Sequence, residues 1–185
     1  MASARAPIQD TTLVREVFAR VTRDLTAILG LELELSGQLV ERLRFRPAGK
    51  RQIHLSFKLG FEREGQARRH GALLVPLPEA ATMAGSLLML PGEAIARCRA
   101  STSLDLAAKD ALLEIGSMVA AACSTALAEL GVAGVSVRSE GCQGVRADVR
   151  PAFPYEEGSE LVVGRASASI GPFPPFEMLL LLPEL

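Results

Sequence analysis

The sequence has few residues of the kinds that mark many functional sites. Among its 185 residues there is no tryptophan, one tyrosine and two histidines, and aromatic residues make up 4%. Such a chain has little with which to stack on the bases of single-stranded nucleic acid. The formal net charge is −1, so no overall attraction to nucleic acid or to an anionic membrane surface is expected. We therefore expect neither nucleic acid nor lipid among its partners.

Membrane and export signals are also missing. No uninterrupted run approaches the about 20 apolar residues that a membrane-spanning helix requires, and residues 1–10 (MASARAPIQD) lack the apolar core of a signal peptide. Cys98, Cys123 and Cys142 are odd in number and far apart, which is typical of reduced thiols rather than of a disulfide framework or zinc site. These features predict a cytoplasmic protein without membrane insertion.

The common catalytic and cofactor motifs are absent as well. The sequence has no P-loop, no dinucleotide-binding glycine pattern, no HExxH and no GxSxG. His54 lies in the outward-facing phase of an expected strand, and His70 follows two arginines at the start of another, so we expect both at the surface rather than as ligands or bases. A Cys–His nucleophile pair stays open, although no spacing supports it. We expect no cofactor or metal on this chain, and an unrelated small-molecule enzyme is the least favoured class.

The residues that are present indicate a folded α+β protein. Hydrophobic residues make up 49% and charged residues 22%, the profile of a soluble globular chain. Helical spacing of apolar residues over 12–30 ends at Gly30. Alternation then predicts strands in 31–46, in 53–61, where all the apolar side chains share one side, and in 70–78.

A similar order of elements follows in the second part of the chain. The pattern predicts a short helix at 79–90, an exposed connector at 92–103 and a long helix at 110–131. Turn residues then separate four expected strands, near 133–139, 144–150, 160–170 and 175–183.

The two parts resemble each other, which indicates a pseudo-two-fold repeat. LTAILGLELELSG (25–37) is echoed by TALAELGVAGVSV (125–137), and ALLVPLPEA is echoed by MLLLLPEL at the end of the chain. We predict one domain over 1–185, made of two halves, 12–91 and 104–183, each a helix followed by about three strands. Short turns imply antiparallel pairing within each half, in one sheet with both long helices on one face. Open sheet edges make a homodimer plausible.

Three polar residues interrupt the apolar surface of the long helix. Asp110, Glu114 and Ser117 are spaced by four and then three residues, and at about 100° per residue they lie within roughly 60° of one another. The opposite side carries an apolar stripe that is expected to pack on a sheet or on another helix. The polar face is either a solvated surface or a working surface.

A stretch of basic residues has two possible interpretations. Arg42, Arg44, Arg46, Lys50 and Arg51 follow one another along an expected strand and the turn after it. The favoured reading is a solvated strand edge whose charges discourage pairing with other chains. The alternative is a docking patch for an acidic partner.

The stretch KDALLEIGSMVAAA (109–122) resembles the signature helix of the CheC/CheX/FliY family of chemotaxis phosphatases, which act on response regulators. In that family the motif reads as an acidic or Ser residue, three residues, Glu, two residues and Asn. Asp110 and Glu114 match the first two positions, and Ser117 stands where the Asn is expected. The strand and short helix in 73–90 and the repeated plan are also similar to the family, so the resemblance covers about 12–183.

The resemblance implies a partner and a chemistry. In the family the Glu–Asn pair enters the active site of a phosphorylated receiver domain, which itself supplies the aspartyl phosphate and Mg²⁺. The Asn orients the attacking water and the Glu contacts the receiver's lysine, so catalysis consists of positioning. By this resemblance Glu114 would anchor, Ser117 would place the water and Asp110 would assist orientation.

Three departures from the family pattern bear on activity. A Ser hydroxyl ends about 1.4 Å short of an Asn amide and lacks its paired donor and acceptor, and a misplacement of about 1 Å can cost ~100-fold in rate. A Pro expected about two dozen residues after the Asn position is missing, and Pro151 comes later. The first helix offers Glu16 followed by Ala19 rather than Asn, so the single motif resembles CheX rather than CheC.

These features define the function expected from the sequence. The chain is expected to dock on a phosphorylated CheY-like receiver domain, with hydrolysis of its phosphoryl group weakened by Ser117. The alternatives are a non-catalytic module that binds the regulator and a structural module like those of the flagellar switch, which share the fold and lack the Glu–Asn pair.

Overall fold

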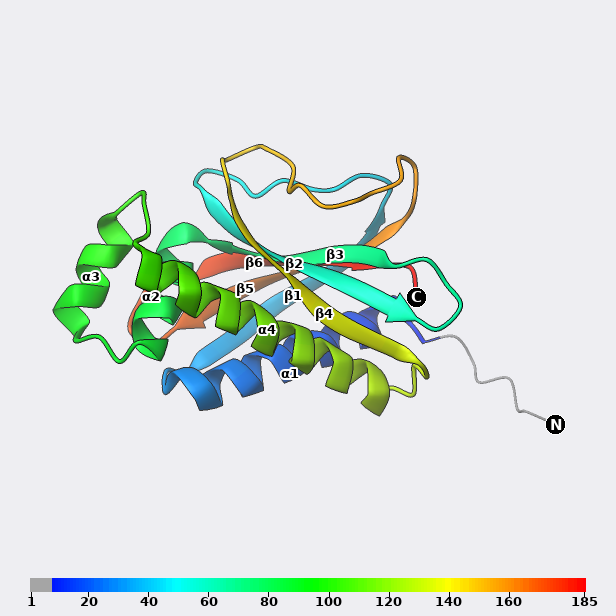
Figure 1. The fold of residues 1–185 in the computed structure, drawn as a ribbon, viewed down its shortest axis with the longest axis horizontal. Helices are drawn as coiled ribbons and strands as arrows, with labels where there is room; N and C mark the ends of the chain where they lie inside the picture. The colour runs from blue at the N-terminus through cyan, green and yellow to red at the C-terminus, as the bar shows by residue number, and fades with distance from the viewer. Residues whose placement is uncertain (1–7) are drawn as a thin grey trace.

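The computed structural model describes residues 8–185, so residues 1–7 of the stretch considered for a signal peptide lie outside it. Two long helices cover one face of a six-stranded sheet, and two short helices lie together at one end of it (Figure 1). The elements in chain order are α1 (Asp10–Leu29), β1 (Leu33–Leu43), β2 (His54–Arg63), β3 (Arg69–Pro76), α2 (Leu77–Leu87), α3 (Gly92–Ala100), α4 (Leu106–Glu129), β4 (Val135–Val145), β5 (Leu161–Ile170) and β6 (Phe176–Pro183).

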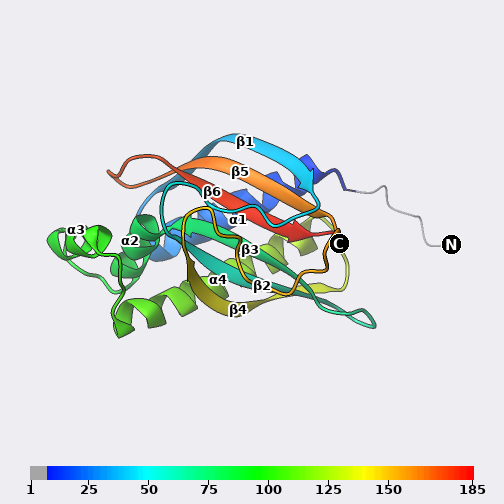
Figure 2. The same cartoon turned by 90° about the horizontal axis from the view of Figure 1, so that it is seen from above.

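The sheet is antiparallel throughout and has the strand order β1-β5-β6-β3-β2-β4 (Figure 2). Exchanging the elements of the two halves, β1 with β4, β2 with β5 and β3 with β6, reverses this order and leaves it otherwise unchanged. The predicted α+β class and pseudo-two-fold repeat are therefore confirmed, with the pseudo-axis between β3 and β6.

The pairing within each half differs from the expectation. The hairpins β2–β3 and β5–β6 form as predicted. The first strand of each half, however, pairs with the hairpin of the other half: β1 with β5, and β4 with β2. Short turns favour pairing of neighbouring strands, but the connections of 44–53 and 146–160 are long enough to let β1 and β4 cross to the far edges.

Each edge strand is one continuous strand with a bulge. In β4 the register shifts where Gly141 has φ 88°, so EGCQG, expected as a turn, lies inside the strand, and the strand expected at 144–150 was wrong beyond Val145. In β1 the register shifts between Ser36 and Leu39, beside Gly37 at φ 58°. A glycine in the left-handed region is the usual device for such a bulge.

Both long helices pack on the same face of the sheet, as predicted, and lie side by side (Figure 1). α1 ends at Gly30, whose φ of 64° is the expected helix stop. Its apolar side is buried against α4 and β5, and the strand β2 presents Leu55, Phe57 and Leu59 to the same core, as its alternation predicts.

One helix among the described residues, α4, is long and apolar enough to span a membrane by length and composition alone, with a mean hydropathy of 1.6. Its sequence contains no long uninterrupted apolar run, because Glu and Asp residues lie among the apolar residues. In the fold, 56% of that window is buried, because the helix packs on α1, α2 and β4.

The segment 92–103, expected to be an exposed connector, contains α3. None of the residues of α3 is buried. Arg99 fixes its end to α2 by donating hydrogen bonds to Glu79 Oε1 at 2.8 Å and Thr82 Oγ1 at 2.6 Å.

Candidate functional site on helix α4

The site begins with the cap that starts α4. Asp105 Oδ1 accepts a hydrogen bond of 2.8 Å from the backbone N–H of Ala108, which is a favourable N-cap. The helix therefore starts at Leu106 rather than at 110. Asp110 consequently lies beyond the first turn, where the helix dipole gives an acidic residue little stabilisation, so capping electrostatics does not account for its place.

Packing fixes which side of α4 faces solvent. Gly116 lets the helix approach the sheet closely, because a Cβ there would lie 3.1 Å from Ser139 Oγ and 3.3 Å from Phe57 Cδ1. About two turns further on, Ser124 Oγ accepts a hydrogen bond of 2.7 Å from the backbone N–H of Val137 in β4. Ile115 is fully buried beside them. These contacts hold the opposite face of the helix toward solvent.

Asp110, Glu114 and Ser117 all lie exposed on this outer face. Among residues 8–185 neither carboxylate forms an ion pair or a side-chain hydrogen bond. Two large apolar side chains, Leu106 and Leu113, are exposed on the same helix, with 74% and 46% of their surface accessible. The outer face of α4 therefore combines two unpaired carboxylates with two exposed leucine side chains.

The Ser117 hydroxyl is turned back toward its own helix. Its Oγ donates a hydrogen bond of 3.2 Å to the carbonyl oxygen of Leu113. The proton is thus engaged, while the oxygen lone pairs stay available to accept a hydrogen bond from a water or partner. An amide at the same position would present both a donor and an acceptor.

The corresponding charges of α1 are all neutralised by neighbours. Arg20 pairs with Asp24 at 2.8 Å, Arg15 with Glu16 at 3.1 Å, and the remaining charged side chains of the helix also have partners. The two pseudo-equivalent helices therefore present different surfaces, and only α4 offers unpaired carboxylates.

The histidine predictions need correction. His54 lies in the outward phase of β2 as expected, but it is only 3% exposed, because the loop carrying Gly49 covers it so closely that a Cβ at Gly49 would overlap its ring. Burial lowers the pKa of His54, against the opposing effects of the Gln52 carbonyl, Glu177 and Glu79. His70 is half-buried, with Nδ1 2.8 Å from Glu140 Oε2.

The three cysteines are free thiols. Burial raises the pKa of Cys123 to about 12, and burial also raises the pKa of Cys142 despite the nearby Lys58. Neither of these two thiols is an activated nucleophile. Within residues 8–185 no group of three His, Cys, Asp or Glu side chains could hold a metal ion.

Arg42, near the end of β1, and Arg44, just after it, are exposed as expected and are also paired with acidic side chains. Arg42 pairs with Asp10 at 2.6 Å and with Glu160 at 3.1 Å, and Arg44 pairs with Glu160 at 3.2 Å. These contacts raise the pKa of Arg42 and lower that of Glu160. Arg46 donates two hydrogen bonds of 3.0 Å to backbone carbonyls of the loop before β5. The sequence pattern could not indicate these partners, which are more than 100 residues away except for Asp10.

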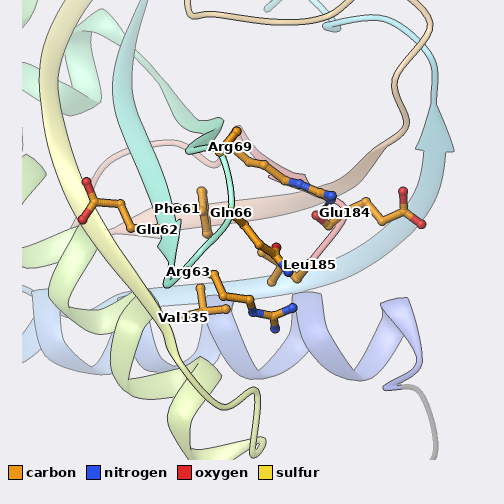
Figure 3. A pocket seen from close by; sticks show the side chains of 9 residues that line it. Phe61, Glu62, Arg63, Gln66, Arg69, Val135, Glu184 and Leu185 are labelled. Atoms are coloured by element: carbon orange, nitrogen blue, oxygen red, sulfur yellow. Dashed lines mark hydrogen bonds between the residues drawn. The ribbon is translucent and has the colours of Figure 1, made fainter.

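A small cavity near the C-terminus is no candidate for a ligand. Side chains of the β2–β3 turn and of the last two residues surround it (Figure 3). Its volume of about 20 Å³ accommodates about one water molecule.

The sequence matches no protein-family model and no curated protein. The fold, however, matches solved structures. FliY of Thermotoga maritima superposes with a TM-score of 0.67 at 13% identity over 98% of this chain and 92% of that chain. CheX of Vibrio vulnificus gives 0.59 at 15% identity over 91% and 97%. A chain of the FliG–FliM complex of H. pylori gives 0.62 at 14% identity over 94% and 91%. The resemblance drawn from residues 109–122 is thus confirmed at the level of architecture: the chain has the fold of the CheC/CheX/FliY chemotaxis proteins.

Proposed function

We propose that this chain is a cytoplasmic chemotaxis-signalling protein that docks on a phosphorylated response-regulator receiver domain through the outer face of α4. The observation that carries the proposal is the exposure of Asp110 and Glu114 without ion partners among the described residues, on a domain with the CheX and FliY fold. The exposed Leu106 and Leu113 supply apolar contact area beside them.

Each residue has a proposed role in the docked state. Glu114 forms the ion pair with the receiver's active-site lysine, and Asp110 assists orientation. Ser117 accepts a hydrogen bond from a water molecule that lies between it and the acyl phosphate. The receiver contributes the aspartyl phosphate and Mg²⁺, so the chain itself adds only positioning.

Hydrolysis by this chain is proposed to be weak. The Ser117 hydroxyl is shorter than an Asn side chain and its proton is engaged by the Leu113 carbonyl. A water held only by the serine lone pairs is placed less well for in-line attack than one held by an amide.

The test is the decay of the acyl phosphate on receiver domains from the same genome, with wild type, Ser117→Asn and Glu114→Ala. We expect little acceleration by wild type and a gain of about 10- to 100-fold with Ser117→Asn, since misplacement of about 1 Å costs this much. Glu114→Ala in the Ser117→Asn background should abolish the gain. Glu16→Ala on α1 is the matched control and should change nothing.

A second candidate is a structural module like those of the flagellar switch, because the fold is equally similar to a chain of the FliG–FliM complex. Under this alternative no phosphorylated receiver domain would bind to the chain, and the acyl phosphate of the receiver would not decay faster in its presence. A FliG-like protein from the same genome would bind to the chain instead. Calorimetric titration of both partner types against wild type separates the two functions.

A further inference from the structure

Two grooves lie beside the loops that cover the sheet face opposite α1 and α4 (Figure 1). The β2 groove, of about 770 Å³, is lined in part by residues 50–52, which precede β2, and by residues 174–177 at the start of β6. The β5 groove, of about 680 Å³, is lined in part by residues 154–156, which precede β5, and by residues 66–70 at the start of β3. Exchanging the two halves of the chain converts one position into the other, so the grooves are pseudo-equivalent. Both volumes fall in the range of small-molecule sites.

Most of the charged side chains that line the β2 groove already have a partner. Arg99 donates a hydrogen bond of 2.8 Å to Glu79. Arg165 pairs with Glu177 at 3.5 Å and also with Glu41 at 3.0 Å. The two arginines and the two carboxylates among these lining residues balance each other, so they leave no net charge for a ligand.

Lys50 and Arg51 are the lining charges that remain. Both are exposed, and neither forms an ion pair within residues 8–185. Arg51 has a φ of 71°, in the left-handed region, where the Cβ of a residue other than glycine meets steric resistance. Strained positions of this kind concentrate at binding and active sites. The β2 groove therefore carries two unpaired positive charges, one of them on a residue held in a disfavoured conformation.

The backbone on both sides of these two cations is fixed. The N–H of Asp148 donates a hydrogen bond of 2.9 Å to the Gly49 carbonyl oxygen, and Gly49 lies against the His54 ring. The Gln52 carbonyl oxygen accepts a hydrogen bond of 2.8 Å from Nδ1 of the same ring. Because the loop is already held in place, an anion that binds the two cations does not have to order it.

The pseudo-equivalent β5 groove has a different charge. Its lining residues without an ion partner in the described part of the chain are Glu156, Glu184 and Arg69, two acidic and one basic. Its remaining charged side chains, Arg68 and Glu160, are paired. The two grooves thus occupy equivalent places in the fold, but only the β2 groove has an excess of unpaired positive charge.

We propose that the β2 groove binds a small organic molecule that carries a carboxylate or phosphate group. The oxyanion accepts hydrogen bonds from the ammonium of Lys50 and the guanidinium of Arg51, groups that pair well with such anions. The apolar part of the molecule contacts Leu39, which is 68% exposed, and the lining residues Pro174 and Pro175. The groove lies across the sheet from the outer face of α4, so this binding is separate from receiver docking.

The experiment is an NMR titration of the full chain with benzoate and with phenyl phosphate, which carry the two kinds of oxyanion on the same apolar ring. We expect at least one of them to shift the backbone amide signals of Lys50, Arg51 and Gln52, and neither to shift those of Glu156 and Ser159 in the β5 groove. The probe that binds, or binds more tightly, identifies the oxyanion. Benzamide, which has the same ring and no charge, should bind at least tenfold more weakly than that probe.

Three results would overturn the proposal. The first is that neither anion shifts the signals of residues 50–52. The second is that benzamide binds as tightly as the anions, because the two cations then contribute nothing. The third is that inorganic phosphate binds as tightly as phenyl phosphate and benzoate, because the groove then holds an adventitious ion only.

Variants separate binding from folding. Arg51→Gly removes the guanidinium and places glycine at a φ that favours it, so the free energy of unfolding should stay equal or rise. The affinity for the anion should fall about tenfold or more, as expected for loss of a hydrogen bond between charged groups. The Lys50→Ala/Arg51→Ala double variant should weaken binding further.

Lys109→Ala is the matched control, since it removes an exposed cation of α4 that has no ion partner within residues 8–185. The affinity of Lys109→Ala for the anion should equal that of wild type. Unchanged affinity in Arg51→Gly, or an equal loss in Lys109→Ala, would contradict the assignment of the site to the β2 groove.

Discussion

His54 links the structure to pH at the scale of a single residue. Burial lowers the pKa of its ring from about 6.5, against the opposing effects of the Gln52 carbonyl, Glu177 and Glu79. Below pH 6.5 the unfolded chain therefore takes up a proton that the folded chain does not. The free energy of unfolding is expected to fall as pH decreases below 6.5, until the folded-state pKa is passed.

Urea unfolding of wild type and His54→Asn between about pH 5 and 8 measures this effect. Asn keeps a donor for the Gln52 carbonyl and removes the titration. The free energy of unfolding of His54→Asn should therefore depend less on pH in this window than that of wild type. The same pH dependence in both proteins would show that His54 does not titrate as proposed.

The sequence reveals side-chain alternation but not what covers a strand. Alternation in β2 correctly placed Leu55 and Phe57 in the core and His54 on the other face. Whether that other face meets water depends on the loop at Gly49, whose position follows from distant contacts such as the hydrogen bond between Asp148 N and the Gly49 carbonyl. The burial of His54 could therefore not be read from local pattern.

At the scale of elements, the contact of α1 with β5 depends on one glycine. A Cβ at Gly164 would overlap the Val14 side chain and lie 2.9 Å from Phe18 Cε2, and both side chains are fully buried. Gly164→Ala should therefore lower the free energy of unfolding by about 1–3 kcal/mol, the usual cost of overpacking.

Gly144→Ala is the matched control, since a Cβ at this strand glycine meets nothing within 4 Å. Urea unfolding compares both variants with wild type. Equal stability of the two variants would mean that α1 shifts freely on the sheet.

Part of the arrangement of helices and strands could be predicted from the sequence. The two long helices and the strand β2, which alternates, lie about where the periodicity predicts them, and β5 and β6 lie about where the turn residues predict them. The edge strand β4 was predicted as two strands because Gly141 resembles a turn residue. A bulge keeps a strand continuous through pairing with its neighbour, and that pairing is not visible in the local sequence. The polar positions of α4 were identified by spacing, whereas their lack of ion partners required the fold.

At the scale of the whole molecule, neither half is complete by itself. Among the strands of residues 8–185, β1 pairs only with β5 and β4 only with β2, and α1 packs on α4. Residues 1–91 and residues 92–185, expressed separately, are therefore expected not to fold as monomers, and to regain native-like circular dichroism and a cooperative transition when mixed. A monomeric fragment that unfolds cooperatively alone would contradict this.

The crossing of the first strands also has an evolutionary consequence. A chain of half this length could build the same sheet as a domain-swapped homodimer, in which each copy lends its first strand to the other. Both helices of such a dimer would have identical surfaces and two equal sites. One polypeptide is free of that constraint, and its two helices differ: the charged side chains of α1 all have ion partners on α1, β1 or α4, while Asp110 and Glu114 on α4 are exposed. The symmetric backbone thus allows the two pseudo-equivalent helices to present different surfaces.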